Sequence, residues 1–128
     1  VVTLGSSQVT NDTGTSNFLM MLFASVDGIS KVGYYDGSAS DQTIQTGFTP
    51  RFLIVKRING SGQWIVYDTV RGVGTGATDD YIVRLDDNTA QVGGYDHLDF
   101  VSNGFTVNGD FWQEVNSSGN KYIYYAHA

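Results

Sequence analysis

Two apolar runs near the middle of the chain define its clearest element. Residues 51–58 and 63–69 are both strand-like, and residues 59–62, Asn-Gly-Ser-Gly, separate them. Asparagine and glycine tolerate the positive φ angles that a short loop between antiparallel strands requires, so the pattern predicts a β-hairpin. Alternation along the second arm places Trp64 and Val66 on the same face. Because the first arm is apolar on both faces, we expect Trp64 to lie in the core.

Further short strand-like runs are spaced along the rest of the chain. Residues 31–35 and 42–48 flank a turn at residues 36–38, Asp-Gly-Ser, and are expected to pair as a second hairpin. Other strand-like positions are residues 18–24, 81–85, Val101, 105–107 and 121–128. No segment has an apolar period of 3.6 residues long enough to predict a helix. The pattern predicts an all-β fold, a β-sandwich or jelly-roll-like domain with about eight short antiparallel strands.

The end of the chain repeats the plan of an earlier segment. Residues 122–128, Tyr-Ile-Tyr-Tyr-Ala-His-Ala, parallel residues 18–24, Phe-Leu-Met-Met-Leu-Phe-Ala, at a spacing of 128 − 24 = 104 residues. Similarity at a fixed period indicates tandem modules, although chance similarity between two apolar strands is the alternative. We therefore interpret residues 1–30 as the end of a preceding repeat or a connector with one strand, and residues 31–128 as a β-sandwich repeat module.

Composition narrows the classes of partner. Sixteen glycines, one proline and an acid content that is almost all aspartate favour strands and tight turns over helices. The net charge of −6 argues against binding to nucleic acid, which needs a basic surface to replace counterions. The chain has no cysteine, so thiolate metal sites and disulfides are excluded. The longest apolar run, residues 18–24, is far shorter than the roughly 20 residues of a membrane helix.

The polar residues do not form a recognisable catalytic set. His97 is expected in a solvated turn and His127 on the last strand, and no Gly-x-Ser-x-Gly elbow accompanies either. Glu114 is the only glutamate, and its spacing from the aspartates gives no support for a polysaccharide-cleaving enzyme. Asp68 and Arg71 are spaced to bond locally or with Arg57. We therefore expect no enzyme activity, no catalytic residues and no cofactor.

Two carboxylate pairs and two loop aromatics are the candidates for binding. The pairs Asp79-Asp80 and Asp86-Asp87 could hold calcium, but turn capping explains them without a metal, and we expect none. Tyr95 and Trp112 lie in loop-like contexts where a ring could stack on a sugar or pack in an interface. The candidate ligand-binding or partner-binding residues are Tyr95, Asp96, Trp112, Asp79 and Asp80.

Several blocks of the sequence resemble a repeat in virion proteins of tailed bacteriophages, especially marine and cyanobacterial ones. The blocks occur in the same order as in that repeat, and together they cover nearly all of residues 31–128. They are residues 31–39, Lys-Val-Gly-Tyr-Tyr-Asp-Gly-Ser-Ala; 46–57, Thr-Gly-Phe-Thr-Pro-Arg-Phe-Leu-Ile-Val-Lys-Arg; 62–72, Gly-Gln-Trp-Ile-Val-Tyr-Asp-Thr-Val-Arg-Gly; 100–107, Phe-Val-Ser-Asn-Gly-Phe-Thr-Val; and 116–126, Asn-Ser-Ser-Gly-Asn-Lys-Tyr-Ile-Tyr-Tyr-Ala.

The resemblance implies a module on the surface of a virion, in a tail fibre or as a capsid-decoration protein. Our leading hypothesis is a non-enzymatic structural or adhesion module that assembles as a homo-oligomer, with a trimer favoured. Its partners would be other virion proteins or a glycan of the host surface, without nucleic acid and without membrane insertion. The alternative hypothesis is a lectin-like module that recognises a carbohydrate receptor through its loop aromatics and aspartates.

Overall fold

The computed structural model describes residues 1–128 except 13, 15–16, 75, 77–79 and 110–113. Its described residues form nine β-strands and one 3-10 helix, η1 (Thr69–Arg71). The strands are β1 (Ser30–Asp36), β2 (Gln42–Gln45), β3 (Phe52–Arg57), β4 (Trp64–Asp68), β5 (Asp80–Arg84), β6 (Val92–Tyr95), β7 (Leu98–Val101), β8 (Gly104–Val107) and β9 (Lys121–His127).

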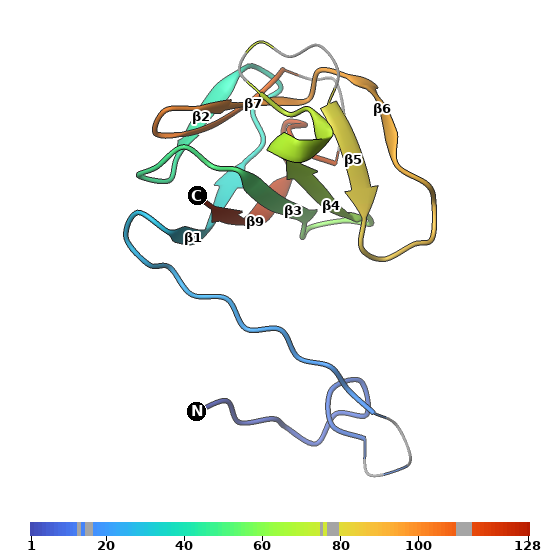
Figure 1. The fold of residues 1–128 in the computed structure, drawn as a ribbon. Coiled ribbons are helices and arrows are strands. Elements are labelled where there is room, and N and C mark those ends of the chain that lie inside the picture. The colour runs from blue at the N-terminus through green and yellow to red at the C-terminus, as the bar shows by residue number, and fades with distance from the viewer. Residues whose placement is uncertain (13, 15–16, 75, 77–79, 110–113) are drawn as a thin grey trace.

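The strands form two antiparallel sheets that pack as the layers of a sandwich (Figure 1). A six-stranded sheet has the order β1-β9-β3-β4-β5-β6, and a three-stranded sheet has the order β2-β8-β7. The predicted all-β sandwich is therefore confirmed. The hairpin of β3 and β4 is also confirmed, with Val55 opposite Ile65 and the loop at residues 59–62 between the strands.

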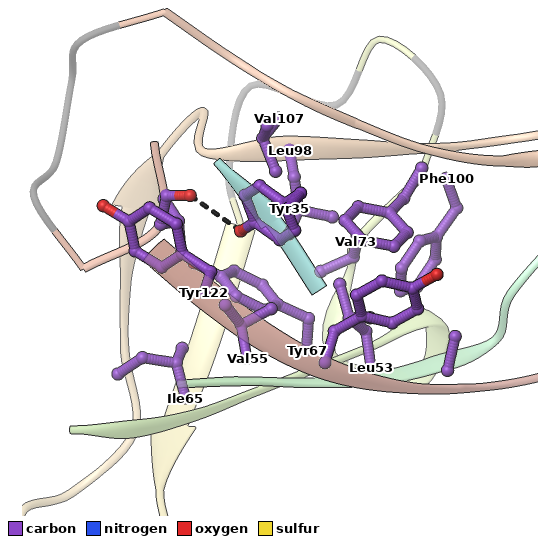
Figure 2. Packing of buried hydrophobic residues seen from close by; sticks show 14 of the residues in the cluster. Tyr35, Leu53, Val55, Ile65, Tyr67, Val73, Leu98, Phe100, Val107 and Tyr122 are labelled. Atoms are coloured by element: carbon purple, nitrogen blue, oxygen red, sulfur yellow. Dashed lines mark hydrogen bonds between the residues drawn. The ribbon is translucent and has the colours of Figure 1, made fainter. Parts of the chain in front are cut away.

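Aromatic side chains join the two sheets in the core. The ring of Phe105 in β8 lies 6.1 Å from that of Tyr35 and 5.2 Å from that of Tyr124, both edge to face. Tyr35 also stacks on Tyr122 at 5.0 Å, and its hydroxyl donates a hydrogen bond of 2.7 Å to the carbonyl of Val115 (Figure 2). Edge-to-face and stacked ring pairs contribute roughly 0.5–1.5 kcal/mol each beyond the area that they bury. These contacts fix the sheets against each other.

The predicted hairpin of residues 31–35 and 42–48 is wrong. β1 pairs with β9 in the larger sheet, whereas β2 pairs with β8 in the smaller one, so the chain crosses between layers after Asp36. The buried side chain of Asn116 organises this crossing: its amide oxygen accepts from the backbone N–H of Ser38 at 3.0 Å, and its amide nitrogen donates to the carbonyl of Ser40 at 2.9 Å. The turn residues therefore connect two sheets.

The prediction that Trp64 lies in the core is also wrong. Trp64 and Val66 do share one face of β4, but the residues between and after them, Ile65 and Tyr67, are the ones that are fully buried against the other sheet. Trp64 is 39% exposed on the opposite, outer face of the six-stranded sheet. Both faces of the hairpin are apolar, so alternation could separate the two faces but could not show which one points inward.

Residues 18–24 do not form the strand that their sequence predicts. They run as an extended segment away from the sheets, with the N-terminus lying apart from the sandwich (Figure 1). The segment is tied down only near its end, where Ala24 accepts a 2.8 Å hydrogen bond from the hydroxyl of Ser30 and Ser25 accepts one of 3.0 Å from the backbone of Val32. A strand needs a neighbouring strand for its backbone hydrogen bonds, and here none lies beside it.

Candidate functional site

The outer face of the six-stranded sheet carries an unbroken apolar row. Registers place Val32 opposite Tyr125, Tyr125 opposite Ile54, Ile54 opposite Val66, and Val66 opposite Val83. The row therefore crosses β1, β9, β3, β4 and β5 without a charged side chain. An antiparallel sheet with one wet face normally alternates apolar and polar residues, so an apolar outer row is the pattern of a face that another surface covers.

A groove lies beside this row on the outer face. It has a volume of about 550 Å³. Its sheet side includes Ile54, Trp64 and Ile123, and its other side includes Met21 and Phe23 of the N-terminal segment. Among the described residues that line the groove, Asp86 is the one with a carboxylate, which accepts a 3.1 Å hydrogen bond from the backbone N–H of Trp64. The groove therefore suits an apolar side chain.

The N-terminal segment is itself apolar and uncovered. Each residue from Phe18 to Phe23 is exposed, by fractions between 46% and 89%. Phe23 makes the main contact with the sheet, where its ring lies 4.4 Å from that of Tyr125. The segment and the groove are thus two apolar surfaces on one chain, which meet at Met21 and Phe23.

Three of the binding residues expected from sequence, Asp80, Tyr95 and Asp96, lie close together where the start of β5 pairs with the end of β6. Tyr95 at the end of β6 and the adjacent Asp96 are exposed, and Asp96 accepts a 2.6 Å hydrogen bond from the side chain of Asn108. Asp80 is fully buried, so it cannot offer its carboxylate to a large ligand from the surface. Asp79 and Trp112 lie outside the described residues. Tyr95 and Asp96 are the exposed members of this group and form the candidate contact.

His97 lies in a buried polar cluster, which corrects the expectation of a solvated turn. Its ring is 3.3 Å from the hydroxyl of Tyr67 and stacks on Tyr95 at a centroid distance of 4.8 Å. Its backbone N–H and that of Leu98 donate to the same carboxylate oxygen of Asp80, at 2.7 and 2.8 Å. Asp80 thus fixes the start of β7 against the start of β5.

Burial shifts the two ionisable groups of this cluster in opposite directions. Desolvation raises the pKa of Asp80 to about 6, and the hydrogen bonds from Leu98 and His97 only partly oppose that shift. Desolvation also lowers the pKa of His97 to about 4, because it disfavours the charged imidazolium. Both side chains are therefore held toward their neutral forms in the folded protein.

These two pKa shifts make the free energy of unfolding depend on pH in opposite directions. The folded state keeps a proton on Asp80 that the unfolded chain loses, so this contribution to stability is present below pH 3.8 and is lost as the pH rises through about 6. The unfolded chain protonates His97 more readily, so that contribution is present above pH 6.5 and is lost as the pH falls through about 4. Between about pH 4 and about pH 6, the two contributions to the free energy of unfolding therefore nearly cancel.

In the Asp80→Asn variant only the contribution of His97 remains. We expect the free energy of unfolding of this variant to rise by up to roughly 3 kcal/mol from about pH 4 to about pH 6.5. In the His97→Gln variant only the contribution of Asp80 remains, and its free energy of unfolding should fall by a similar amount over the same pH range. Urea denaturation across this range measures both slopes. If both variants keep the flat profile expected of the parent protein, the assignment of these buried groups is wrong.

Asp68 and Asp87 both form local hydrogen bonds. Asp68 caps η1 by accepting a 2.8 Å hydrogen bond from the backbone of Arg71, and the two side chains form an ion pair. This is the local bond of the two alternatives that the sequence left open. Asp87 accepts a 2.7 Å hydrogen bond from the backbone of Thr89. Among the described residues, no group of three or more His, Asp or Glu side chains is arranged to hold a metal ion.

The described residues form an all-β sandwich module with an apolar row on the outer face of its larger sheet. The whole chain, residues 1–128, matches one family model, Domain of unknown function (DUF7483), and the protein belongs to this family. No curated protein and no solved structure matches the chain. Within the described part of the chain, no helix has the length and apolarity needed to cross a membrane.

The outer face was not identified from sequence, although its signal is present. Residues 52–55 and 122–125 are continuous apolar or aromatic runs, whereas a strand with one wet face alternates. Such runs predict strands covered on both sides, and the structure shows only one side covered by the smaller sheet. The uncovered side is the surface to which a function can be assigned.

Proposed function

We propose that the protein is a non-enzymatic structural or adhesion module that assembles with copies of itself on the particle of a tailed bacteriophage. The observation that carries the assembly is the apolar row across the outer face of the six-stranded sheet, from Val32 to Val83. Ile54 and Val66 at the middle of this row are buried within the chain, whereas Val32 at one end is 42% exposed. Trp64, beside the row, is 39% exposed. Exposed apolar surface of this kind marks contact surfaces in folded proteins. A trimer is the favoured assembly, and it requires no cofactor.

The virion location is supported by the sequence blocks that resemble the phage repeat. Those blocks fall on β1, β3, β4, β8 and β9, which make up most of the two layers. The proposed site is the virion surface, in a tail fibre or as a capsid-decoration protein. The proposed partners are other virion proteins or the host surface, and neither nucleic acid nor membrane insertion is part of the proposal.

We expect light scattering on the purified chain to give the mass of a trimer at micromolar concentration. The physical reason is that burial of the apolar row contributes about 25 cal/mol for each Å² removed from water. High salt should leave the assembly intact, because the net charge of −6 opposes association and salt screens that repulsion. A monomer mass across this range would contradict the proposed assembly.

The place on the particle is tested separately. Antibodies raised against the chain should decorate phage particles in electron micrographs, on the capsid for a decoration protein or on the distal tail for a fibre. Fluorescently labelled protein that binds emptied capsids but not host cells selects the first location, and the reverse selects the second. Absence of the antigen from purified particles would contradict the virion proposal while leaving the assembly in place.

A lectin-like module is the second candidate. The specific observation in its favour is the pair of exposed residues Tyr95 and Asp96, because a tyrosine face and a neighbouring carboxylate can together contact a sugar. Stacking of Tyr95 on His97 holds that ring in place. A glycan array with and without calcium tests this candidate, and a Tyr95→Ala variant is its matched control. Absence of binding under both conditions removes the lectin function.

A further inference from the structure

The N-terminal segment, residues 18–23, presents two sets of apolar side chains. In an extended segment, alternate side chains point to opposite sides. Met21 and Phe23 line the groove of their own chain, so residues of the other set, Met20 and Leu22, point away from it. Leu22 is 71% exposed. Met20 is 48% exposed, and Figure 1 shows the N-terminal part of the chain lying apart from the sandwich.

The groove also has apolar side chains that remain exposed on its sheet side. Phe23 holds the segment against Tyr125 on one side of the groove, with the ring centroids 4.4 Å apart. On the other side, Trp64 and Leu85 remain 39% and 52% exposed although they line the same cavity. The cavity of about 550 Å³ therefore has one wall from the sheet, one wall from the segment and room for further apolar side chains between them.

Charge limits where a second copy can dock. The chain carries a net charge of −6, so two copies repel each other over most of their surfaces. Residues 18–26 contain no Asp, Glu, Lys or Arg, and Asp86 is the one residue of these four types among the described residues that line the groove. Contact between the segment of one copy and the groove of another brings the two molecules together where this repulsion is smallest and the apolar area is largest.

We propose that the segment of one copy packs into the groove of a neighbouring copy, with Met20 and Leu22 against the neighbour's Trp64 and Leu85. This inference rests on the self-assembly within the proposed function and names the surface that carries it. Each copy supplies one segment and one groove, so the contact is of the head-to-tail type and closes as a ring when the rotation between copies permits. The trimer proposed above is such a ring.

Cross-linking tests the contact directly, because the chain has no cysteine of its own. Leu22→Cys and Leu85→Cys variants, one of them tagged, are mixed as multimers, allowed to exchange and oxidised mildly. We expect a disulfide-linked pair that contains one copy of each variant. The control pair replaces Leu85→Cys with Thr43→Cys, an exposed position in β2 of the other sheet. Linkage to Thr43→Cys that is as efficient as to Leu85→Cys, or no linkage to Leu85→Cys, overturns the proposed contact.

An association measurement gives an independent result. The Leu22→Asp variant places a charge in the proposed contact, and we expect it to associate at least roughly tenfold more weakly with an unchanged melting temperature at low concentration. Val70→Asp is the matched control, because Val70 is 87% exposed and lies in η1, away from the groove. Equal association of the two variants overturns the contact. A parent protein that is a monomer overturns the proposed assembly as well, whereas a multimer without the Leu22 effect overturns the contact alone.

Discussion

Replacing Asn116 with alanine is expected to lower the free energy of unfolding by about 3–5 kcal/mol, which is a large part of the 5–15 kcal/mol typical of a domain. Asn116 is fully buried. Its amide oxygen accepts from Ser38 and from the side chain of Gln42 at 3.0 and 2.7 Å. Its amide nitrogen donates to the carbonyls of Ser40 and Asn108 at 2.9 and 3.0 Å.

The alanine variant leaves several of these groups without a partner inside the protein. A buried donor or acceptor that loses its partner costs about 1–3 kcal/mol, and water entering the vacated space recovers part of that loss. Chemical denaturation of the parent and the variant measures the difference. Asn103→Ala is the control, because Asn103 is exposed and its side chain bonds only to Gln45 among the described contacts. A loss no larger than that of Asn103→Ala would show that Asn116 does not organise the crossing between sheets.

The second large effect is expected from Phe105→Ala, which should cost about 3–5 kcal/mol of unfolding free energy. Phe105 is fully buried, and its ring meets Tyr35 and Tyr124 across the interior of the sandwich. Trp64→Ala is the matched comparison, since it removes a larger ring from a partly exposed position. We expect that change to cost less than about 2 kcal/mol.

Thermal and urea melts of these two variants should be made at low protein concentration, so that assembly does not add to the measured stability. We expect Phe105→Ala to be the more destabilising of the two variants, although the hairpin pattern predicts that Trp64 lies in the core. If Trp64→Ala destabilises the dilute protein as much as Phe105→Ala does, the tryptophan belongs to the core and the outer face is misassigned.

The elements that sequence predicted well are those whose partners are near in the chain. The hairpin of β3 and β4 has both arms and its Asn-Gly-Ser-Gly loop within residues 51–69, so local patterns were sufficient. β1 and β2 are also close in sequence, but they pair with β9 and β8, at the far end of the chain. Turn residues at 36–38 are compatible with a hairpin and with a crossing, and only the distant Asn116 decides between them.

The candidate site depended even more on tertiary contacts. His97 has the charged sequence neighbours Asp96 and Asp99, which favoured a solvated turn, and its burial follows from the backbone bonds to Asp80. The choice of inner and outer face for Trp64 required knowing where the three-stranded sheet packs. Residues 18–24 carry a strand pattern, but a pattern cannot supply the neighbouring strand that a β-sheet requires.

Fluorescence quenching of Trp64 tests the central claim, that the outer face of the six-stranded sheet is a contact surface between copies. The chain has two tryptophans, so a Trp112→Phe variant leaves Trp64 as the sole reporter. Acrylamide quenching is measured as the protein is concentrated from about 1 μM to about 100 μM, a range over which mass action drives association. We predict that quenching falls and emission shifts to the blue as copies assemble, and that Leu22→Asp in the same background abolishes both changes. Quenching that stays constant while light scattering reports a growing mass would contradict the claim.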